Sequence, residues 1–157
     1  MSFRRQSGFS VIESLVVMTM LGILLALGLP AFQHYNAGLA LRRTSERMLE
    51  ELRRARQRAA AEHNNVIVTF SAGSGTMQVH DDDNNDGTIN GTEQIRTVTV
   101  VDGVELSGVE IAPSDSLVFT LLGTLRDRNG GGFLTITGCS GDSDTLFVSA
   151  VGHISRS

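Results

Sequence analysis

The sequence is poor in cysteine and in aromatic residues, and this limits the kinds of core and metal site that it can form. Cys139 is its only cysteine, so the chain can form neither an intramolecular disulfide nor a cysteine-based metal cluster. We expect this thiol to be a buried small apolar residue. Tryptophan is absent, and aromatic residues make up 5% of the chain. A core must therefore consist mainly of valine, isoleucine and leucine, and this composition favours strands.

Lysine is absent as well, so all 13 basic side chains are arginine, and the formal net charge is −4. Residues 36–62 hold seven arginines and four glutamates, whereas residues 63–157 hold four arginines and twelve acids. A length of 157 residues allows one domain with one appendage. The charge pattern predicts a basic stem and an acidic head, and an acidic head disfavours nucleic acid as a partner.

One long apolar run, residues 9–29, follows a short polar segment that contains Arg4 and Arg5. A helix of this length spans about 30 Å, which is the thickness of the hydrocarbon core of a bilayer. An ordinary cleaved secretory signal has an apolar region of about 7–15 residues, so this run is too long for one. It predicts a membrane-spanning helix whose basic flank stays in the cytoplasm while the remainder is exported.

Glu13 is the one ionisable residue in this run. A carboxylate deep in lipid costs about 2.5–3.5 kcal/mol on insertion scales, and chains rarely retain one without a partner. The alternative is an incidental glutamate in a plain membrane anchor. The cost of the charge favours a functional role for Glu13.

The segment Arg4-Arg5-Gln6-Ser7-Gly8, followed by Phe9-Ser10-Val11-Ile12-Glu13, resembles the class III signal of type IV pilins and pseudopilins. The resemblance implies that a prepilin peptidase cuts between Gly8 and Phe9 and that Phe9 becomes the N-methylated terminus. Glu13 is then the fifth mature residue. Pro30 resembles the helix-kinking proline of the family.

Cleavage would leave an ammonium group on Phe9 at the level of the membrane. Glu13 of a neighbouring subunit can pair with that group, because an unpaired charge of either sign is costly at low dielectric. The resemblance thus implies assembly with other pilin or pseudopilin subunits. It also implies a single-pass protein of the bacterial inner membrane with a periplasmic head.

The residues predict an α+β fold in which a long N-terminal helix packs on an antiparallel sheet. We divide the chain into a leader (1–8), a transmembrane segment (9–30), an amphipathic stem helix (31–62) and a β-rich head (63–157). On the stem, Leu41, Met48, Leu52, Ala55 and Ala59 share one face, and the polar residues 62–65 end the helix. Strands are expected at 66–70, 76–80, 94–101, 117–122, 133–137 and 145–151.

Three parts of the stem and head resemble the H-type minor pseudopilin of type II secretion systems and related minor pilins. They are residues 54–61 followed by Val66-Ile67-Val68, residues 119–124, and residues 148–154 with Gly152. Leu121 stands where that family has a proline. The resemblance implies a minor pseudopilin, with a type IV minor pilin involved in DNA uptake or pilus assembly as the alternative.

The acidic segment after His80 matches the spacing of a calcium-binding loop. Such a loop takes oxygen ligands at positions 1, 3, 5, 7, 9 and 12 and a glycine at position 6. A membrane-anchored calcium module is therefore one hypothesis, and a hairpin loop rich in Asp, Asn and Gly is the other. The residues of the frame are Asp82, Asn84, Asp86, Gly87, Thr88, Asn90 and Glu93.

Other kinds of chemistry find little support in the sequence. The four histidines, at positions 34, 63, 80 and 153, are scattered and fit no metal or catalytic-triad spacing, so we expect no enzymatic activity. Some minor pilins of DNA-uptake systems bind DNA near the C-terminus. Here Arg126, Arg128 and Arg156 are the candidate phosphate contacts.

Overall fold

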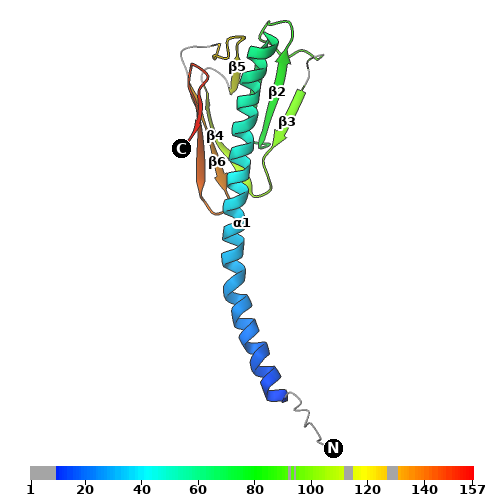
Figure 1. Ribbon diagram of the computed structural model, residues 1–157, viewed down its shortest axis with the longest axis vertical. Helices are drawn as coiled ribbons and strands as arrows, with labels where there is room; N and C mark the ends of the chain where they lie inside the picture. The colour runs from blue at the N-terminus through cyan, green and yellow to red at the C-terminus, as the bar shows by residue number, and fades with distance from the viewer. Residues whose placement is uncertain (1–9, 92, 94, 112–114, 127–130) are drawn as a thin grey trace, which may run out of the picture. The chain divides into compact units, whose positions relative to one another are not determined.

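The computed structural model describes residues 10–91, 93, 95–111, 115–126 and 131–157. The chain consists of two units, Met1–Asn36 and Ala37–Ser157. Helix α1 (Val11–Glu62) contributes residues to both units (Figure 1).

In the first unit, every described side chain from Ser10 to Asn36 is exposed. The carbonyl oxygen of Ser10 accepts the N–H groups of Glu13 and Ser14 at 3.1 and 3.2 Å, and these bonds begin α1. The helix continues through Pro30, which supplies no N–H to the preceding turn. Among the described residues, α1 is the helix long and apolar enough to cross a membrane, by length and composition.

In the second unit, one face of α1 is buried. The five apolar residues expected on this face, Leu41, Met48, Leu52, Ala55 and Ala59, are all at most 6% exposed. Thr44, Ser45 and Glu51 are buried with them. The helix ends at Glu62 as expected, and His63 takes a left-handed φ of 57°, a conformation common just after a helix.

Sheet A has the strand order β3-β2-β1-β5, and every neighbouring pair is antiparallel. The strands are β1 (Asn65–Ser71), β2 (Thr76–Asp82), β3 (Ile95–Thr99) and β5 (Ser116–Phe119). Strands β1 to β3 follow one another as a meander, whereas β5 returns from farther along the chain to pair with β1.

Sheet B has the strand order β4-β6-β7-β8 and is also antiparallel. Its strands are β4 (Val104–Ile111), β6 (Gly132–Gly138), β7 (Ser143–Val148) and β8 (Ile154–Arg156). In Figure 1, β2 and β3 lie on one side of α1, and β4 and β6 lie on the other. One apolar cluster joins α1 to both sheets, with Leu52, Val68, Phe119, Leu134 and Leu146 among its members.

The α+β class with a helix on antiparallel sheets is confirmed, but the expected strands need correction. Strands β4 and β8 were not expected, and the strands form two sheets instead of one. Strand β5 ends at Phe119, not at residue 122, because Gly123 donates to the Thr120 carbonyl in a turn at 2.7 Å. Strand β7 ends at Val148, not at residue 151, because Gly152 donates to the Ser149 carbonyl at 2.8 Å.

The expectation of a buried cysteine is also wrong, because Cys139 is exposed. This residue directly follows β6, in a turn where the N–H of Gly138 donates to the carbonyl of Asp142 at 2.8 Å. The thiol donates to the carbonyl oxygen of Gly103 at 2.9 Å. A turn position outside the sheet explains why the thiol does not enter the core.

Candidate assembly helix and head surface

Glu13 lies in the first turn of α1, on a segment whose described side chains all face outward. Val11, Met18 and Leu27 are 84%, 76% and 72% exposed. Within the described residues Glu13 has no side-chain hydrogen bond or ion pair. Gly8 and Phe9, the predicted processing residues, lie outside the described residues. A lone carboxylate on an uncovered apolar helix is a group that needs a partner from outside the chain.

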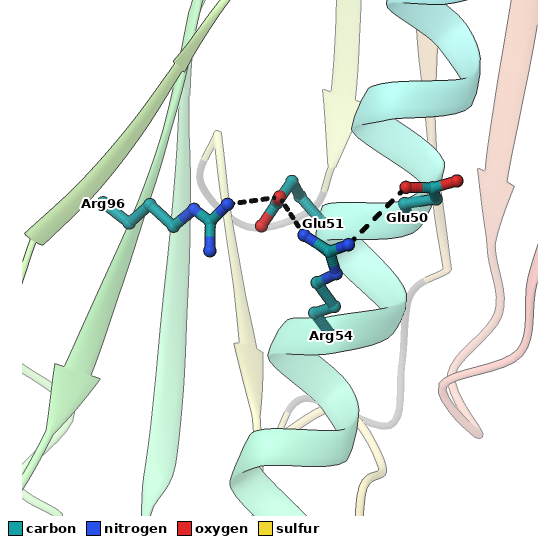
Figure 2. Close-up of polar contacts among 4 residues, drawn as sticks. All are labelled: Glu50, Glu51, Arg54 and Arg96. Carbon is teal, nitrogen blue, oxygen red and sulfur yellow. Dashed lines mark hydrogen bonds and ion pairs between the residues drawn. The ribbon is translucent and has the colours of Figure 1, made fainter.

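A buried carboxylate ties the stem part of α1 to sheet A. Glu51 is 5% exposed, and its Oε1 lies 2.9 Å from Arg54 Nη1 and 2.9 Å from Arg96 Nη2 on β3 (Figure 2). Glu50 also faces Arg54, at 3.8 Å, but both side chains are mostly exposed. The pair with Arg96 links the helix to the strand, and the two arginines together keep the charge of Glu51 from being unpaired in a buried site.

A second ion pair joins the end of α1 to β2. Arg58 Nη2 lies 2.6 Å from Asp81 Oδ2, and Arg58 Nε lies 3.0 Å from Glu62 Oε2. Burial raises the pKa of Asp81, and the nearby positive charge of Arg58 opposes that shift. The ion pairs of Glu51 and Asp81 were not predicted. Glu51 did carry a signal, because a charged residue between Met48, Leu52 and Ala55 on the apolar face of a helix requires a partner.

The structure places the candidate nucleic-acid residues in separate surroundings. Arg156 is 30% exposed at its side chain and pairs with Asp144 at 2.6 Å and with Glu46 at 3.6 Å. Arg126 is exposed, and its guanidinium lies against Gly87 in the acidic loop. Arg128 lies outside the described residues. Of the two described cations, Arg156 is therefore neutralised by acids of its own chain, and Arg126 lies against a loop rich in acids.

In the acidic loop, the first residue of the calcium frame accepts hydrogen bonds from the loop backbone. Asp82 is fully buried, and its Oδ1 and Oδ2 accept the N–H groups of Asp86 at 3.0 Å and of Gly87 at 2.8 Å. Asn65 Nδ2 donates to the same Oδ2 at 3.3 Å. Both oxygens of Asp82 thus hold the turn together.

The remaining frame residues bond mostly to one another. Asp86 accepts the backbone N–H and the hydroxyl of Thr88, and these bonds lower the pKa of Asp86 to about 2. Asn84 and Asn90 donate to the other oxygen of Asp86, at 2.9 and 3.2 Å. Glu93 is buried and accepts the N–H of Asn90 at 2.7 Å.

Across the described ranges, no group of three or more His, Cys, Asp and Glu side chains is arranged to hold a metal ion. The frame brings its oxygens into one loop, but their hydrogen bonds already account for the shape of that loop. Calcium binding at this loop stays a prediction.

His80 is buried at the end of β2, with 3% of its surface exposed. Among the described residues, neither ring nitrogen has a hydrogen-bond partner. Burial lowers the pKa of His80, and the charge of Glu93 opposes the shift. The folded head therefore favours the neutral form of the His80 imidazole at neutral pH.

Two family models match the chain. Residues 44–152 match the model described as type II transport protein GspH, and residues 3–29 match the prokaryotic N-terminal methylation motif. Two fimbrial proteins of Pseudomonas aeruginosa are each 28% identical in an alignment of 127 residues that covers 71% of this chain and 80% of theirs.

The fold is similar to two solved minor subunits. The minor pseudopilin EpsH from the type 2 secretion system of Vibrio cholerae gives a TM-score of 0.59 at 11% identity, over 74% of this chain and 95% of that one. The type IV minor pilin FimU of Pseudomonas aeruginosa gives 0.59 at 16% identity, over 80% and 92%. The GspH model matches more than half of the length of this chain. The chain therefore belongs to the GspH family of type II transport proteins, the pilin-like minor pseudopilins.

Proposed function

We propose that this minor pseudopilin is cut by prepilin peptidase between Gly8 and Phe9, methylated on Phe9, and assembled into a type II secretion pseudopilus by packing of its N-terminal helix. The carrying observation is the uncovered apolar segment with the single carboxylate of Glu13. When subunits pack these segments together, they bury the exposed apolar side chains and give Glu13 a cationic partner. The proposed role is structural and non-catalytic.

The location that fits this role is the bacterial inner membrane, with one span and a periplasmic head. The methylation-motif match and the apolar helix support a membrane-anchored chain with a single span. Arg4 and Arg5 before the span favour a cytoplasmic N-terminus. In the proposed scheme, prepilin peptidase cuts the chain on the cytoplasmic side of the membrane.

The second candidate is a minor pilin of a type IV pilus, which takes part in DNA uptake or pilus assembly. The two fimbrial relatives and the likeness to FimU favour it. Deletion of the gene in the source bacterium separates the two machines. Loss of protein secretion with normal pili supports the pseudopilus, and loss of pili with normal secretion supports the alternative.

Mass spectrometry of the protein from membranes tests the processing step. We expect a mature chain that begins at Phe9 and carries one added methyl group. An intact Met1, or a cut beyond Ala31, would overturn the proposal.

Filament incorporation tests the role of Glu13. Glu13→Ala should lower incorporation at least tenfold while the protein remains in the membrane, because the Phe9 ammonium of the adjacent subunit loses its partner. Thr19→Ala is the matched control, since the Thr19 hydroxyl donates to the Val16 carbonyl of its own helix at 2.8 Å. Equal incorporation of Glu13→Ala and the parent would refute this mechanism.

A further inference from the structure

The uncovered part of α1 changes from apolar to polar after Phe32. Every side chain of residues 10–36 is exposed, and residues 14–32 include only two polar side chains, Ser14 and Thr19. The hydroxyl groups of these two residues donate to carbonyl oxygens of the same helix, at 3.4 and 2.8 Å. Residues 14–32 therefore present no unpaired polar side chain to their surroundings.

This stretch has the length of the hydrocarbon core of a membrane. At a helical rise of about 1.5 Å per residue, residues 14–32 extend about 28 Å, and the hydrocarbon core of a bilayer is about 30 Å thick. Glu13 lies directly before the stretch, and Gln33 lies directly after it. The apolar run 9–29 is similar in length. Length alone therefore allows two depths of the helix in the membrane, which differ by about one helical turn.

Two aromatic side chains lie at the end of this stretch. Phe32 is 63% exposed and Tyr35 is 65% exposed. The two residues are three positions apart on α1, so they lie on the same face of the helix. Residues 10–31 contain no aromatic side chain, and Tyr35 is the only tyrosine of the chain. The aromatic side chains of this helix are therefore concentrated at the place where its apolar stretch ends.

An aromatic pair at this place is suited to the boundary between lipid tails and headgroups. Tyrosine has an apolar ring and a polar hydroxyl group, and such side chains gather where hydrocarbon meets water. The neighbours of Tyr35 fit a wet boundary, because Gln33, His34 and Asn36 are polar and exposed. Of the two depths, the one with residues 14–32 in the hydrocarbon core places both rings at this boundary.

We propose that Phe32 and Tyr35 bind the headgroup interface of the periplasmic leaflet and fix the depth of the helix, so that Glu13 lies at the cytoplasmic boundary of the hydrocarbon core. With residues 9–29 in the core, Glu13 would instead lie about 6 Å inside it. A carboxylate costs less near the interface than at the bilayer centre. This depth lets a single subunit remain in the membrane before Glu13 gains its partner. The proposal rests on the proposed single span in the inner membrane.

Cysteine labelling of the full chain in membrane vesicles tests the depth. The chain is produced without prepilin peptidase and in a Cys139→Ser background, and it is labelled with a maleimide that does not cross membranes. Ala31→Cys and Asn36→Cys are read from the periplasmic side in right-side-out vesicles, and Val11→Cys is read from the cytoplasmic side in inverted vesicles. In the parent, Val11→Cys should react readily, and Ala31→Cys should react at least fivefold more slowly than Asn36→Cys.

Phe32→Ala combined with Tyr35→Ala removes the aromatic pair. The helix should then move toward the periplasm by about one turn, because residues 9–29 can fill the hydrocarbon core equally well. The labelling rate of Ala31→Cys should rise about fivefold and that of Val11→Cys should fall about fivefold, since the first cysteine leaves the core and the second enters it. Opposite changes at the two ends report a shift of the whole helix, whereas a local disturbance near Phe32 would change only the periplasmic end.

Two further variants serve as controls. Leu24→Ala combined with Leu27→Ala removes two exposed apolar side chains with the same spacing from the middle of the span, and both labelling rates should equal those of the parent. Phe32→Trp combined with Tyr35→Trp should also keep the pattern of the parent, because tryptophan gathers at the same interface.

Two results would overturn the proposal. One is a parent in which Ala31→Cys reacts as fast as Asn36→Cys, or a double alanine variant whose two labelling rates stay unchanged or move in the same direction. The other is unchanged labelling together with reduced filament incorporation, which would assign the aromatic pair to packing between subunits. Labelling is measured on unassembled subunits, so failure of this proposal can be told apart from failure of the Glu13 incorporation test.

Discussion

The Nε atom of Arg156 lies 2.6 Å from Oδ2 of Asp144, a side chain that is 5% exposed. Asp144 is on β7 and Arg156 on β8, and the same guanidinium reaches Glu46 on α1 at 3.6 Å. Arg156, the last basic residue of the sequence, therefore links sheet B to helix α1.

Arg156→Ala should destabilise the head by about 2 kcal/mol. The change leaves Asp144 buried without its partner, and we place the cost below that of a fully buried pair because water reaches part of Arg156. Urea unfolding of a fragment of residues 37–157 measures the effect, since every buried side chain of the described structure lies in that range. Asp144→Asn with Arg156→Ala should recover part of the loss, and a double variant less stable than Arg156→Ala would contradict the argument.

DNA binding by the head should be weak. Arg156 is paired with acids, and clustered free cations supply most phosphate contacts. We expect a shallow dependence of DNA affinity on salt and little change on Arg126→Ala, measured by fluorescence anisotropy with labelled duplex. Arg126 is the better test residue, because its removal disturbs no described ion pair. A steep salt dependence that Arg126→Ala abolishes would instead favour the DNA-uptake alternative.

Local patterns in the sequence predicted the helix well. The apolar face from Leu41 to Ala59 and the end at Glu62 both follow from side-chain spacing and a polar turn, which are properties of neighbouring residues. Strand β4 was missed for a physical reason. Its register shifts between Leu106 and Gly108, so the buried positions change from 104 and 106 to 111 and the alternation that marks a strand is interrupted.

The long-range features could not be read from the sequence. Three-residue β8 is too short to show a period, and it is defined by its pairing with β7. Glu51 is recognisable as a charge on an apolar face, but nothing local identifies its partner Arg96, 45 positions later. Glu13 could be singled out from the sequence, because it lies inside an apolar run long enough to span a membrane. That local pattern was enough to predict a role for its carboxylate.

The buried imidazole of His80 should make the head less stable in mild acid. Burial lowers the pKa of His80 below its unfolded value near 6.5, so the unfolded chain binds the proton more strongly. The stability that depends on neutral His80 is fully present above pH 6.5 and is lost as the pH falls from 6.5 through the lowered pKa of the folded state.

His80→Leu should remove this part of the pH dependence, which urea unfolding of residues 37–157 between pH 7.5 and pH 5 would measure. The variant should show a flatter profile than the parent below pH 6.5. His153→Gln, at an exposed histidine, should keep the profile of the parent. Parallel profiles for His80→Leu and the parent would mean that His80 is not the group responsible.

The calcium hypothesis makes a sharp prediction for the loop after β2. An ion bound only by the folded head raises Tm in proportion to the binding free energy, and a gain of about 1 kcal/mol raises Tm by about 4 °C in a domain of this size. If Glu93 is the ligand at position 12, millimolar calcium should raise the Tm of residues 37–157, and Glu93→Ala should abolish the rise. Asp115→Asn, at an exposed acid outside the loop, should keep it. Because the oxygens of Asp82 and Asp86 already accept hydrogen bonds within the loop, an equal Tm in calcium and in chelator would leave those bonds as the whole reason for the acidic sequence.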